Sequence, residues 1–278
     1  MQLGIHVGVL ARPTFEQKID AAKSHGLECL HLNLEAAGLT APPEKTDSLA
    51  WSRLGEAIRC RGLAVASLSA TFNMIHPDLK RREAGFRRLE WLASAAAMLG
   101  TRVLTLCSGT RDPDDMWRFH PDNQTPAAWN DLITGMATAL ARTARSGVTL
   151  AVEPEPGNVV ASAAAARRLL DEMRSARLGI IIDPANLISK DNLRRQGEVI
   201  ESAFDLLGED VVLAHAKDVD RQGVAGRLPP GRGLLDYHLY LKKLKDFGFA
   251  GPLILHALRE ADVPGSVRFL REILKELG

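Results

Sequence analysis

The chain alternates between short apolar runs and longer amphipathic stretches from its first residues to its last. The apolar runs have the length of strands, and the stretches between them show the spacing of apolar residues that is typical of helices. The expected strands cover residues 3–9, 29–32, 63–68, 103–106, 148–152, 178–182, 211–214 and 253–255. The expected helices cover residues 14–25, 47–61, 78–99, 126–145, 161–174, 191–207, 234–246 and 264–277. Apolar strands separated by helices indicate a parallel sheet with both faces buried.

Eight strand–helix units follow one another over the 278 residues, and no linker or low-complexity tract separates them. An open doubly wound sheet is the alternative arrangement, but the chain lacks the glycine-rich GxGxxG turn that often marks such a sheet. Eight units without that turn favour an α/β fold of the (β/α)8 TIM barrel class, formed as a single domain over residues 1–278.

The composition argues against several kinds of partner and location. The 35 basic and 34 acidic residues leave a net charge of +1, so the surface as a whole does not attract nucleic acid or an anionic membrane. No apolar stretch approaches the roughly 20 residues that span a bilayer. The N-terminus begins directly with a strand-like run, so no signal sequence is expected there. The three cysteines form neither a disulfide framework nor a zinc motif, so a cytoplasmic location is expected.

Four polar residues each follow directly after an expected strand in the second half of the chain. They are Glu153, Asp183, His215 and His256. The C-terminal ends of parallel strands meet on one rim of a barrel, so these side chains are expected to lie close together. A lone acidic residue in such a place is more often a helix cap or a turn former. Four of them at four successive strand ends favour a site for one divalent metal ion, with Mn, Zn, Mg, Co and Fe all compatible with these ligands.

Four segments of the chain resemble the sugar phosphate isomerase/epimerase superfamily of xylose isomerase-like TIM barrels. They are residues 150–158 (LAVEPEPGN), 181–188 (IIDPANLI), 213–221 (LAHAKDVDR) and 249–260 (FAGPLILHALRE). The resemblance extends over nearly the whole chain and implies an enzyme that acts on a sugar or polyol. It implies that Glu153, Asp183 and His215 bind the metal. It also places Asn186 and Arg221 at positions that contact the substrate.

One position departs from the pattern of that superfamily. Its members usually end the eighth strand with a second Glu, which binds the metal and acts as a base on the opposite face of the substrate, whereas this chain has His256. An imidazole can still bind a metal or move a proton, but it cannot chelate as a carboxylate does. Inverting a carbon needs acid/base groups on both faces, whereas an aldose–ketose proton shuttle can use one base. Glu153 and His256 are therefore the expected catalytic groups. This pair favours isomerisation or dehydration relative to epimerisation, which is not excluded.

Further candidates share strand faces with these residues. Lys217 lies two positions after His215 on the same face, so it is expected either in the barrel mouth, as a catalytic group, or in solvent. His31 could reach the site from the second strand. His6, in the first expected strand, is interpreted as a core histidine with satisfied hydrogen bonds.

Three long loops follow the third, fourth and seventh expected strands, on the rim where long loops usually build pockets. The substrate-binding candidates in these loops are Asn73, His76, Arg111, Trp117 and Arg232. Arg111 and Arg232 suit a phosphate or a carboxylate, because a guanidinium group binds such anions through two parallel hydrogen bonds. Trp117 is expected either to form the wall of a sugar site or to pack its loop onto the barrel.

Three functions compete for this pattern. The first is an isomerase or epimerase that abstracts a proton next to a carbonyl through a metal-stabilised enediolate, with an inosose-type dehydratase as the alternative on the same scaffold. The second is DNA cleavage like that of endonuclease IV, against which the 8 histidines and the near-zero charge argue. The third is a barrel that binds a metabolite without converting it. The substrate and the oligomeric state, including a homodimer, are left open by the sequence.

Overall fold

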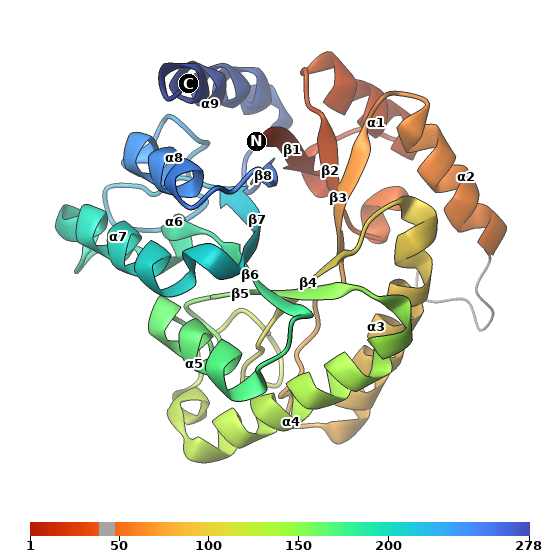
Figure 1. Ribbon diagram of the computed structural model, residues 1–278, viewed down its shortest axis with the longest axis vertical. Helices are drawn as coiled ribbons and strands as arrows, with labels where there is room; N and C mark the ends of the chain where they lie inside the picture. The colour runs from red at the N-terminus through yellow and green to blue at the C-terminus, as the bar shows by residue number, and fades with distance from the viewer. Residues whose placement is uncertain (39–47) are drawn as a thin grey trace.

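Eight parallel strands close into a barrel in the computed structural model, which describes residues 1–38 and 48–278 (Figure 1). The strands follow one another around the barrel in sequence order, and β1 pairs with β8 to close it. They are β1 (Gln2–His6), β2 (Cys29–Leu32), β3 (Ala64–Ser69), β4 (Val103–Cys107), β5 (Thr149–Glu153), β6 (Leu178–Ile182), β7 (Val211–Ala216) and β8 (Pro252–Leu255). The predicted (β/α)8 fold is confirmed.

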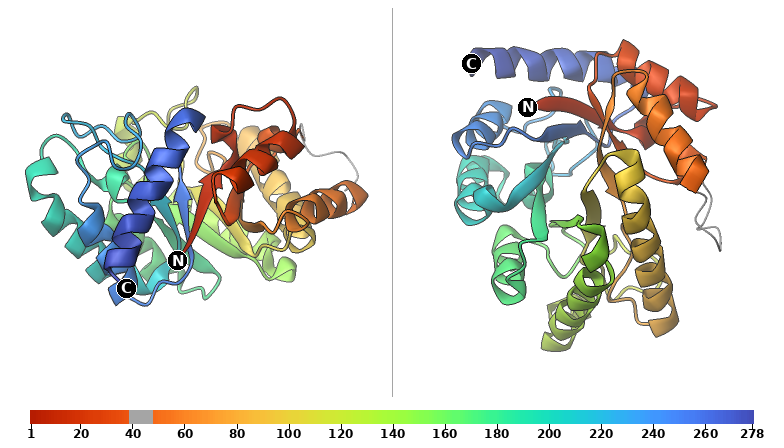
Figure 2. Two further views of the ribbon diagram at one scale, coloured as in Figure 1. Left: turned by 90° about the horizontal axis from the view of Figure 1, so that it is seen from above. Right: turned by 45° about the vertical axis from the view of Figure 1, so that its right-hand side comes forward.

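Helices surround the barrel on its outside (Figures 1 and 2). They are α1 (Phe15–Ser24), α2 (Ser48–Arg59), α3 (Leu79–Leu99), α4 (Pro126–Arg142), α5 (Ala163–Met173), α6 (Pro184–Leu187), α7 (Gln196–Leu207), α8 (Tyr237–Asp246) and α9 (Val263–Glu276). The predicted start of the second helix at Asp47 lies outside the described residues. In the left view of Figure 2, β1 runs upwards, and both chain termini lie at the lower end of the barrel, where β1 begins.

Local sequence signals set the ends of these helices. Thr14 begins α1 by accepting a hydrogen bond from the backbone N–H of Gln17, and the Gln17 side chain accepts one from the backbone N–H of Thr14. This is the reciprocal cap expected from a Thr three residues before a Gln. Gly100 ends α3 in the left-handed conformation (φ 79°), which a residue without a Cβ adopts at little steric cost.

Several element ends differ from the sequence prediction by a few residues, among them the start of α7 at Gln196 instead of 191, and two differences lie at the rim of the barrel. The first strand was predicted to continue to Val9, but it ends at His6, because His6 Nδ1 accepts the backbone N–H of Gly8 and caps a 3-10 turn over Val7–Val9. The short helix α6 was not predicted. Asp183 starts it by accepting the N–H of Ala185, and Pro184 occupies the first helical position, where its missing N–H costs nothing.

A small apolar layer fills the barrel just below its C-terminal rim. Its buried members come from five strands and are Cys29, Ala151, Ile181, Leu213 and Ile254. Gly4 on β1 belongs to the same layer, because a Cβ at Gly4 would lie 2.6 Å from atoms of both Cys29 and Ile254. The absence of a side chain at Gly4 therefore lets the layer close.

This layer determines which side chains reach the rim. Side chains alternate between the two faces of a strand, so the residue two positions further along points to the same interior. Counting two residues on from each member of the layer gives His6, His31, Glu153, Asp183, His215 and His256. The barrel thus carries a polar layer of carboxylates and imidazoles directly above an apolar floor.

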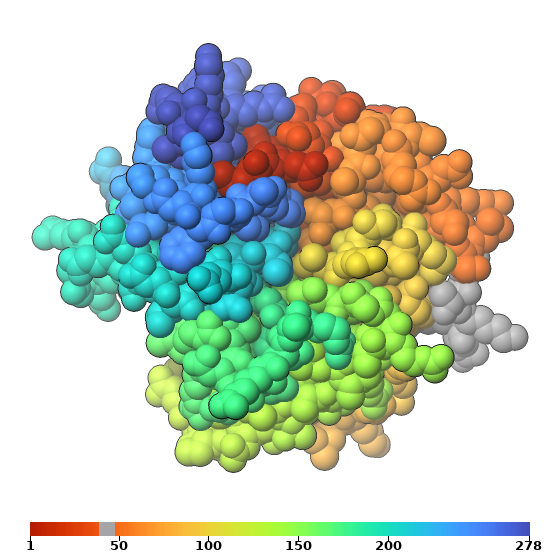
Figure 3. Space-filling model, viewed as in Figure 1, coloured from red at the N-terminus to blue at the C-terminus, as the bar shows by residue number. Residues whose placement is uncertain are grey.

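The larger part of the core lies between the barrel and its helices. The space-filling view shows the first and last segments of the chain in contact, as the pairing of β1 with β8 requires (Figure 3). Within the described residues, no helix combines the length and the apolar character needed to cross a membrane.

The contact between α2 and α3 depends on a glycine. A Cβ on Gly55 would approach the carbonyl oxygen of Met98 to 2.6 Å. We expect Gly55→Ala to force the two helices apart and to lower the free energy of unfolding by about 1–3 kcal/mol. Gly265 near the start of α9 is the matched control, because nothing lies within 4 Å of its Cβ position. Gly265→Ala should raise stability by about 0.5–1 kcal/mol, and equal urea-unfolding midpoints for the two variants would contradict this account.

Candidate active site

Glu153, Asp183 and His215 meet at the C-terminal ends of three neighbouring strands, β5, β6 and β7. His215 Nδ1 lies 3.1 Å from Glu153 Oε1 and 3.6 Å from Asp183 Oδ2. One ligand atom from each residue lies within 4.8 Å of the other two, so a single cation could contact all three. The three residues are 9%, 2% and 3% exposed, respectively, which shields their charges from water.

The polar contacts of this group leave possible ligand atoms facing one another. Asp183 Oδ1 accepts the N–H of Ala185, whereas Asp183 Oδ2 faces two cationic groups, Lys217 Nζ at 3.0 Å and His215 Nδ1 at 3.6 Å. His215 Nε2 is also buried, and it finds no partner within residues 1–38 and 48–278. Two carboxylates and one imidazole are a ligand set that divalent transition metals accept. Glu153, Asp183 and His215 therefore fit a metal ion.

A buried lysine lies against the same two carboxylates. Lys217 Nζ is 3.0 Å from Asp183 Oδ2 and 3.5 Å from Glu153 Oε1. Asn186 connects the lysine to the glutamate, because its Nδ2 donates to Glu153 Oε1 (2.9 Å) and its Oδ1 accepts from Lys217 Nζ (3.0 Å). Of the two positions expected for Lys217 from the sequence, the structure has the one inside the barrel mouth.

Paired charges set the protonation of this group. Burial lowers the pKa of His215, but the carboxylates of Glu153 and Asp183 outweigh it and raise the pKa to about 9. Burial also opposes the charge of Lys217, yet the same two carboxylates hold the pKa of that ammonium above its usual range. Burial would raise the pKa of Asp183, but the charges of Lys217 and His215 hold it below its usual range. Buried ions persist only when they are paired in this way.

Four imidazole rings form a second group, carried by β7, β8, β1 and β2. Their centroids lie 5.0 Å apart for His6 and His31, 5.9 Å for His31 and His215, 5.3 Å for His215 and His256, and 4.9 Å for His256 and His6. Burial and then the charge of His215 lower the pKa of His6 to about 4 and hold the pKa of His256 well below its usual value. A neutral imidazole offers one donor and one acceptor, which suits the hydroxyl groups of a sugar.

His6, expected from the sequence to be a core histidine with satisfied hydrogen bonds, accepts the N–H of Gly8 at its Nδ1. It ends β1, is partly exposed, and has its ring beside that of His256. The strand alternation from Gly4 points both residues into the barrel. His31 lies where the sequence allowed it, with its Nδ1 3.1 Å from Ser67 Oγ.

His256 lies beside the three candidate ligands. Among the described residues, only Glu153, Asp183 and His215 bring ligand atoms within 4.8 Å of one another. His256 Nδ1 is buried and has no hydrogen-bond partner in the described part of the chain. The next residue, Ala257, has a left-handed backbone (φ 54°), a strained conformation for a residue with a Cβ. This sharp turn follows directly on the residue whose ring contacts His215.

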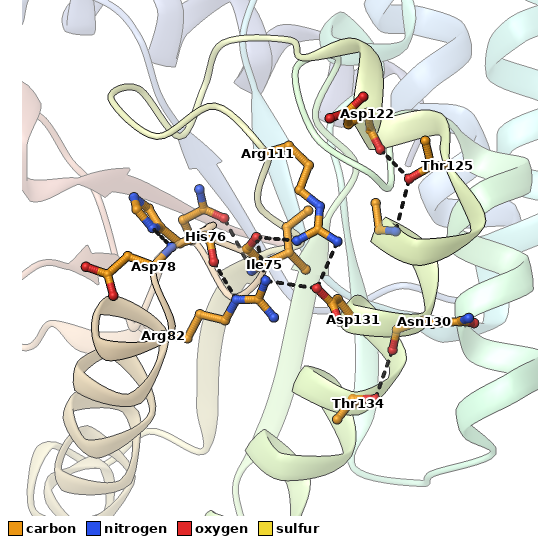
Figure 4. A network of polar contacts seen from close by, with 12 residues as sticks. Ile75, His76, Asp78, Arg82, Arg111, Asp122, Thr125, Asn130, Asp131 and Thr134 are labelled. Carbon is orange, nitrogen blue, oxygen red and sulfur yellow. Dashed lines mark hydrogen bonds and ion pairs between the residues drawn. The ribbon is translucent and has the colours of Figure 1, made fainter.

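Three of the predicted substrate residues, Asn73, His76 and Arg111, make contacts that hold loops together, and Figure 4 shows His76 and Arg111 among them. The Arg111 guanidinium contacts Asp131 Oδ2 (2.8 Å) and the carbonyl oxygen of Ile75 (3.2 Å). His76 Nε2 lies 3.0 Å from the carbonyl oxygen of Pro113. The Asn73 side chain bonds both the N–H and the carbonyl oxygen of Thr110. These contacts join the loop after β3 to the loop after β4 and to α4.

Arg82 strengthens this junction and was not singled out from the sequence. Arg82 Nη2 is 2.8 Å from Asp131 Oδ2, the oxygen that Arg111 also contacts, and 3.2 Å from the carbonyl oxygen of Ile75. Two guanidinium groups thus share one carboxylate, and their charges hold the pKa of Asp131 below its usual range although burial opposes this. Figure 4 shows the two arginines pointing at Asp131 from different elements.

The remaining predicted substrate residues lie on the exposed parts of two loops. Trp117 is 52% exposed, in the loop after β4. Arg221 and Arg232 are exposed, in the loop after β7. These three side chains are therefore available to a ligand at the rim, and they do not join the buried group of Glu153, Asp183 and Lys217.

A buried carboxylate organises the loop after β7. Asp218 is 1% exposed, and its oxygens accept the backbone N–H groups of Val219, Gly231, Gly233 and Leu235 at 2.8–3.0 Å. Because Asp218 follows Lys217 directly, one short segment supplies both the buried ammonium and the anchor of the loop. Asp218 lies within residues 213–221, and the sequence pattern predicted no role for it.

Comparisons with known proteins agree with this architecture. L-ribulose-5-phosphate 3-epimerase UlaE of Shigella flexneri serotype 5b (strain 8401) is 25% identical over 268 residues, covering 93% of this chain and 87% of the relative. A crystal structure of a D-tagatose 3-epimerase-like protein has a TM-score of 0.79 at 16% identity, covering 100% of this chain and 98% of the other. The IOLI protein with a binding zinc atom has a TM-score of 0.73 at 14% identity, with coverages of 100% and 98%. The two structures show a shared fold. The profile of the xylose isomerase-like TIM barrel family matches residues 19–273, and the chain therefore belongs to that family.

Proposed function

We propose that this chain is a metal-dependent isomerase or epimerase that acts on a sugar or a related polyol. The observation that carries the proposal is the convergence of Glu153, Asp183 and His215 at the mouth of a barrel whose curated relatives are sugar epimerases. A carboxylate base beside a cation site provides what the removal of a proton next to a carbonyl requires. The zinc described for the IOLI protein supports a divalent metal here, although the metal identity is not specified by these ligands.

In this proposal Glu153 is the base. Its Oε1 is oriented by Asn186 Nδ2 at 2.9 Å. A bound divalent ion would stabilise the negative charge that develops on the substrate oxygen when the neighbouring carbon loses its proton. Lys217 would donate a hydrogen bond to the same end of the substrate, and His256 would serve as the second proton-transfer group. His256 as a fourth metal ligand, and Arg221, Arg232 and Trp117 as substrate contacts, stay predictions.

A dehydratase is the second candidate, because acidic groups lie next to the base. Glu155 Oε1 is 4.0 Å from Lys217 Nζ. Burial and the charge of Glu153 raise the pKa of Glu155 to about 8, which favours the protonated carboxyl. Eliminating water needs such a proton donor for the departing hydroxide, in addition to a base that removes the proton beside the carbonyl.

The proposal is tested by elemental analysis of the purified protein, followed by a deuterium-exchange screen in D₂O across ketoses, aldoses and inososes. We expect bound divalent metal and deuterium entering one carbon next to the carbonyl of one substrate. Loss of water from that substrate would select the dehydratase, and a changed configuration would select the epimerase. Bound metal without exchange in any candidate would favour the barrel that binds a metabolite without converting it.

A further inference from the structure

The buried ammonium of Lys217 contacts the oxygens that a metal ion would contact. Its Nζ lies 3.0 Å from Asp183 Oδ2 and 3.5 Å from Glu153 Oε1, and these two oxygens also face His215 Nδ1. Lys217 is only 6% exposed, so its charge is balanced by these carboxylates and not by water. A bound metal ion would therefore have to share the charge of these two carboxylates with the ammonium of Lys217.

The backbone of Lys217 and of the residue after it is held in place. Its carbonyl oxygen accepts a hydrogen bond from Tyr237 Oη at 2.7 Å, and both of these residues are buried. Asp218, the next residue, is anchored by four backbone N–H groups of the loop after β7. The ammonium can therefore move only by rotation of its own side chain, within reach of Asn186 Oδ1 at 3.0 Å.

We propose that the Lys217 ammonium is a tethered cation that competes with the divalent metal for Asp183 Oδ2 and Glu153 Oε1. The consequence is a weakly held, exchangeable metal and a site that keeps its carboxylates in place when metal is scarce. A divalent ion brings two positive charges next to an ammonium in a poorly hydrated site, where repulsion is stronger than in water. This inference rests on the metal site of the proposed function.

The test is the affinity of the protein for Mn²⁺ alone, measured from the free Mn²⁺ signal by electron paramagnetic resonance during titration. We expect Lys217→Met and Lys217→Gln to bind Mn²⁺ about tenfold or more tightly than the unaltered chain, because both remove a charge close to the ion. Lys217→Arg, which keeps a positive charge, should stay within about threefold of the unaltered chain. Lys190→Met is the matched control for removal of an exposed lysine and should leave the affinity unchanged.

The outcomes separate this inference from the proposed function. Equal or weaker Mn²⁺ binding by whichever of Lys217→Met and Lys217→Gln folds, judged by circular dichroism, would overturn the competition while leaving a metal enzyme intact. If neither the unaltered chain nor these variants bind Mn²⁺ or Zn²⁺, both the competition and the metal-dependent function fall. Tighter binding by Lys217→Arg as well would also overturn the inference, since charge would then not be the cause.

Discussion

Glu153→Gln is expected to lower kcat by about 10²–10⁴-fold, the range that a positioned acid/base group contributes. The amide keeps an oxygen that can accept the hydrogen bond from Asn186, so the local structure should persist. It cannot take up a proton from carbon at neutral pH, and it removes one of the two carboxylate charges facing Lys217. Metal affinity should fall as well. The rate of deuterium exchange into the substrate is measured at saturating metal, so that a weaker metal affinity does not lower it. Any remaining decrease then reports the loss of the base.

The matched control for this variant is Glu198→Gln on α7, where the glutamate side chain is 72% exposed. It makes the same chemical change away from the barrel mouth and should leave the exchange rate unchanged. If Glu153→Gln at saturating metal exchanged deuterium as fast as the unaltered chain, Glu153 would not be the base, and the proposed mechanism would have to be abandoned.

Asp218→Asn is expected to lower the free energy of unfolding by about 3 kcal/mol. A hydrogen bond to a buried charge contributes about 1.5–3 kcal/mol, and the asparagine loses some of the four that Asp218 accepts. The amide keeps one accepting oxygen but turns its NH₂ group towards backbone N–H groups. Asp218 Oδ2 accepts two of these, from Gly231 and Gly233, at 2.9 Å. The space is too tight for the loop to adjust, because a Cβ at Gly233 would already lie 2.2 Å from Asp218 Oδ1.

Asp220→Asn is the control within the same loop. Asp220 also accepts backbone N–H groups, from Gln222 and Val224, but its side chain is 18% exposed and water can replace a lost contact. We expect a clearly smaller loss of stability than for Asp218→Asn, because water replaces what the exposed carboxylate gives up. Urea unfolding and hydrogen exchange over residues 219–235 measure both variants. Similar costs for Asp218→Asn and Asp220→Asn would show that the buried carboxylate does not hold the loop.

The barrel and the place of its polar layer could be predicted from the sequence because both depend on short-range periodicity. Each apolar run marks a strand, and the alternation of its side chains decides which residues point inwards. This reasoning correctly predicted that Glu153, Asp183 and His215 come together. The end of the first strand was placed too late, at Val9, because the hydrogen bond from Gly8 to His6 Nδ1 that ends it has no strand-like pattern in the sequence.

The roles of loop residues could not be predicted in the same way. Arg111 follows a strand and precedes a long loop, as an anion-binding arginine would, yet its partner is Asp131 on α4. That contact depends on how two loops and a helix pack, and no local pattern in the sequence records it. Lys217 shows the same limit, because the strand period gave its face but not the burial of its ammonium against Asp183.

Because of the way the loop after β7 is attached, substitutions in that loop and substitutions at the buried catalytic group can occur independently. Both ends of the loop are fixed on Asp218, through Val219 on one side and Gly231, Gly233 and Leu235 on the other. The exposed side chains between these ends, such as those of Arg221 and Arg227, can therefore be exchanged without displacing the ammonium of Lys217, the residue that precedes Asp218. Substitutions of these exposed side chains can change which ligand binds at the rim, while Lys217 and the carboxylates that it contacts stay in place.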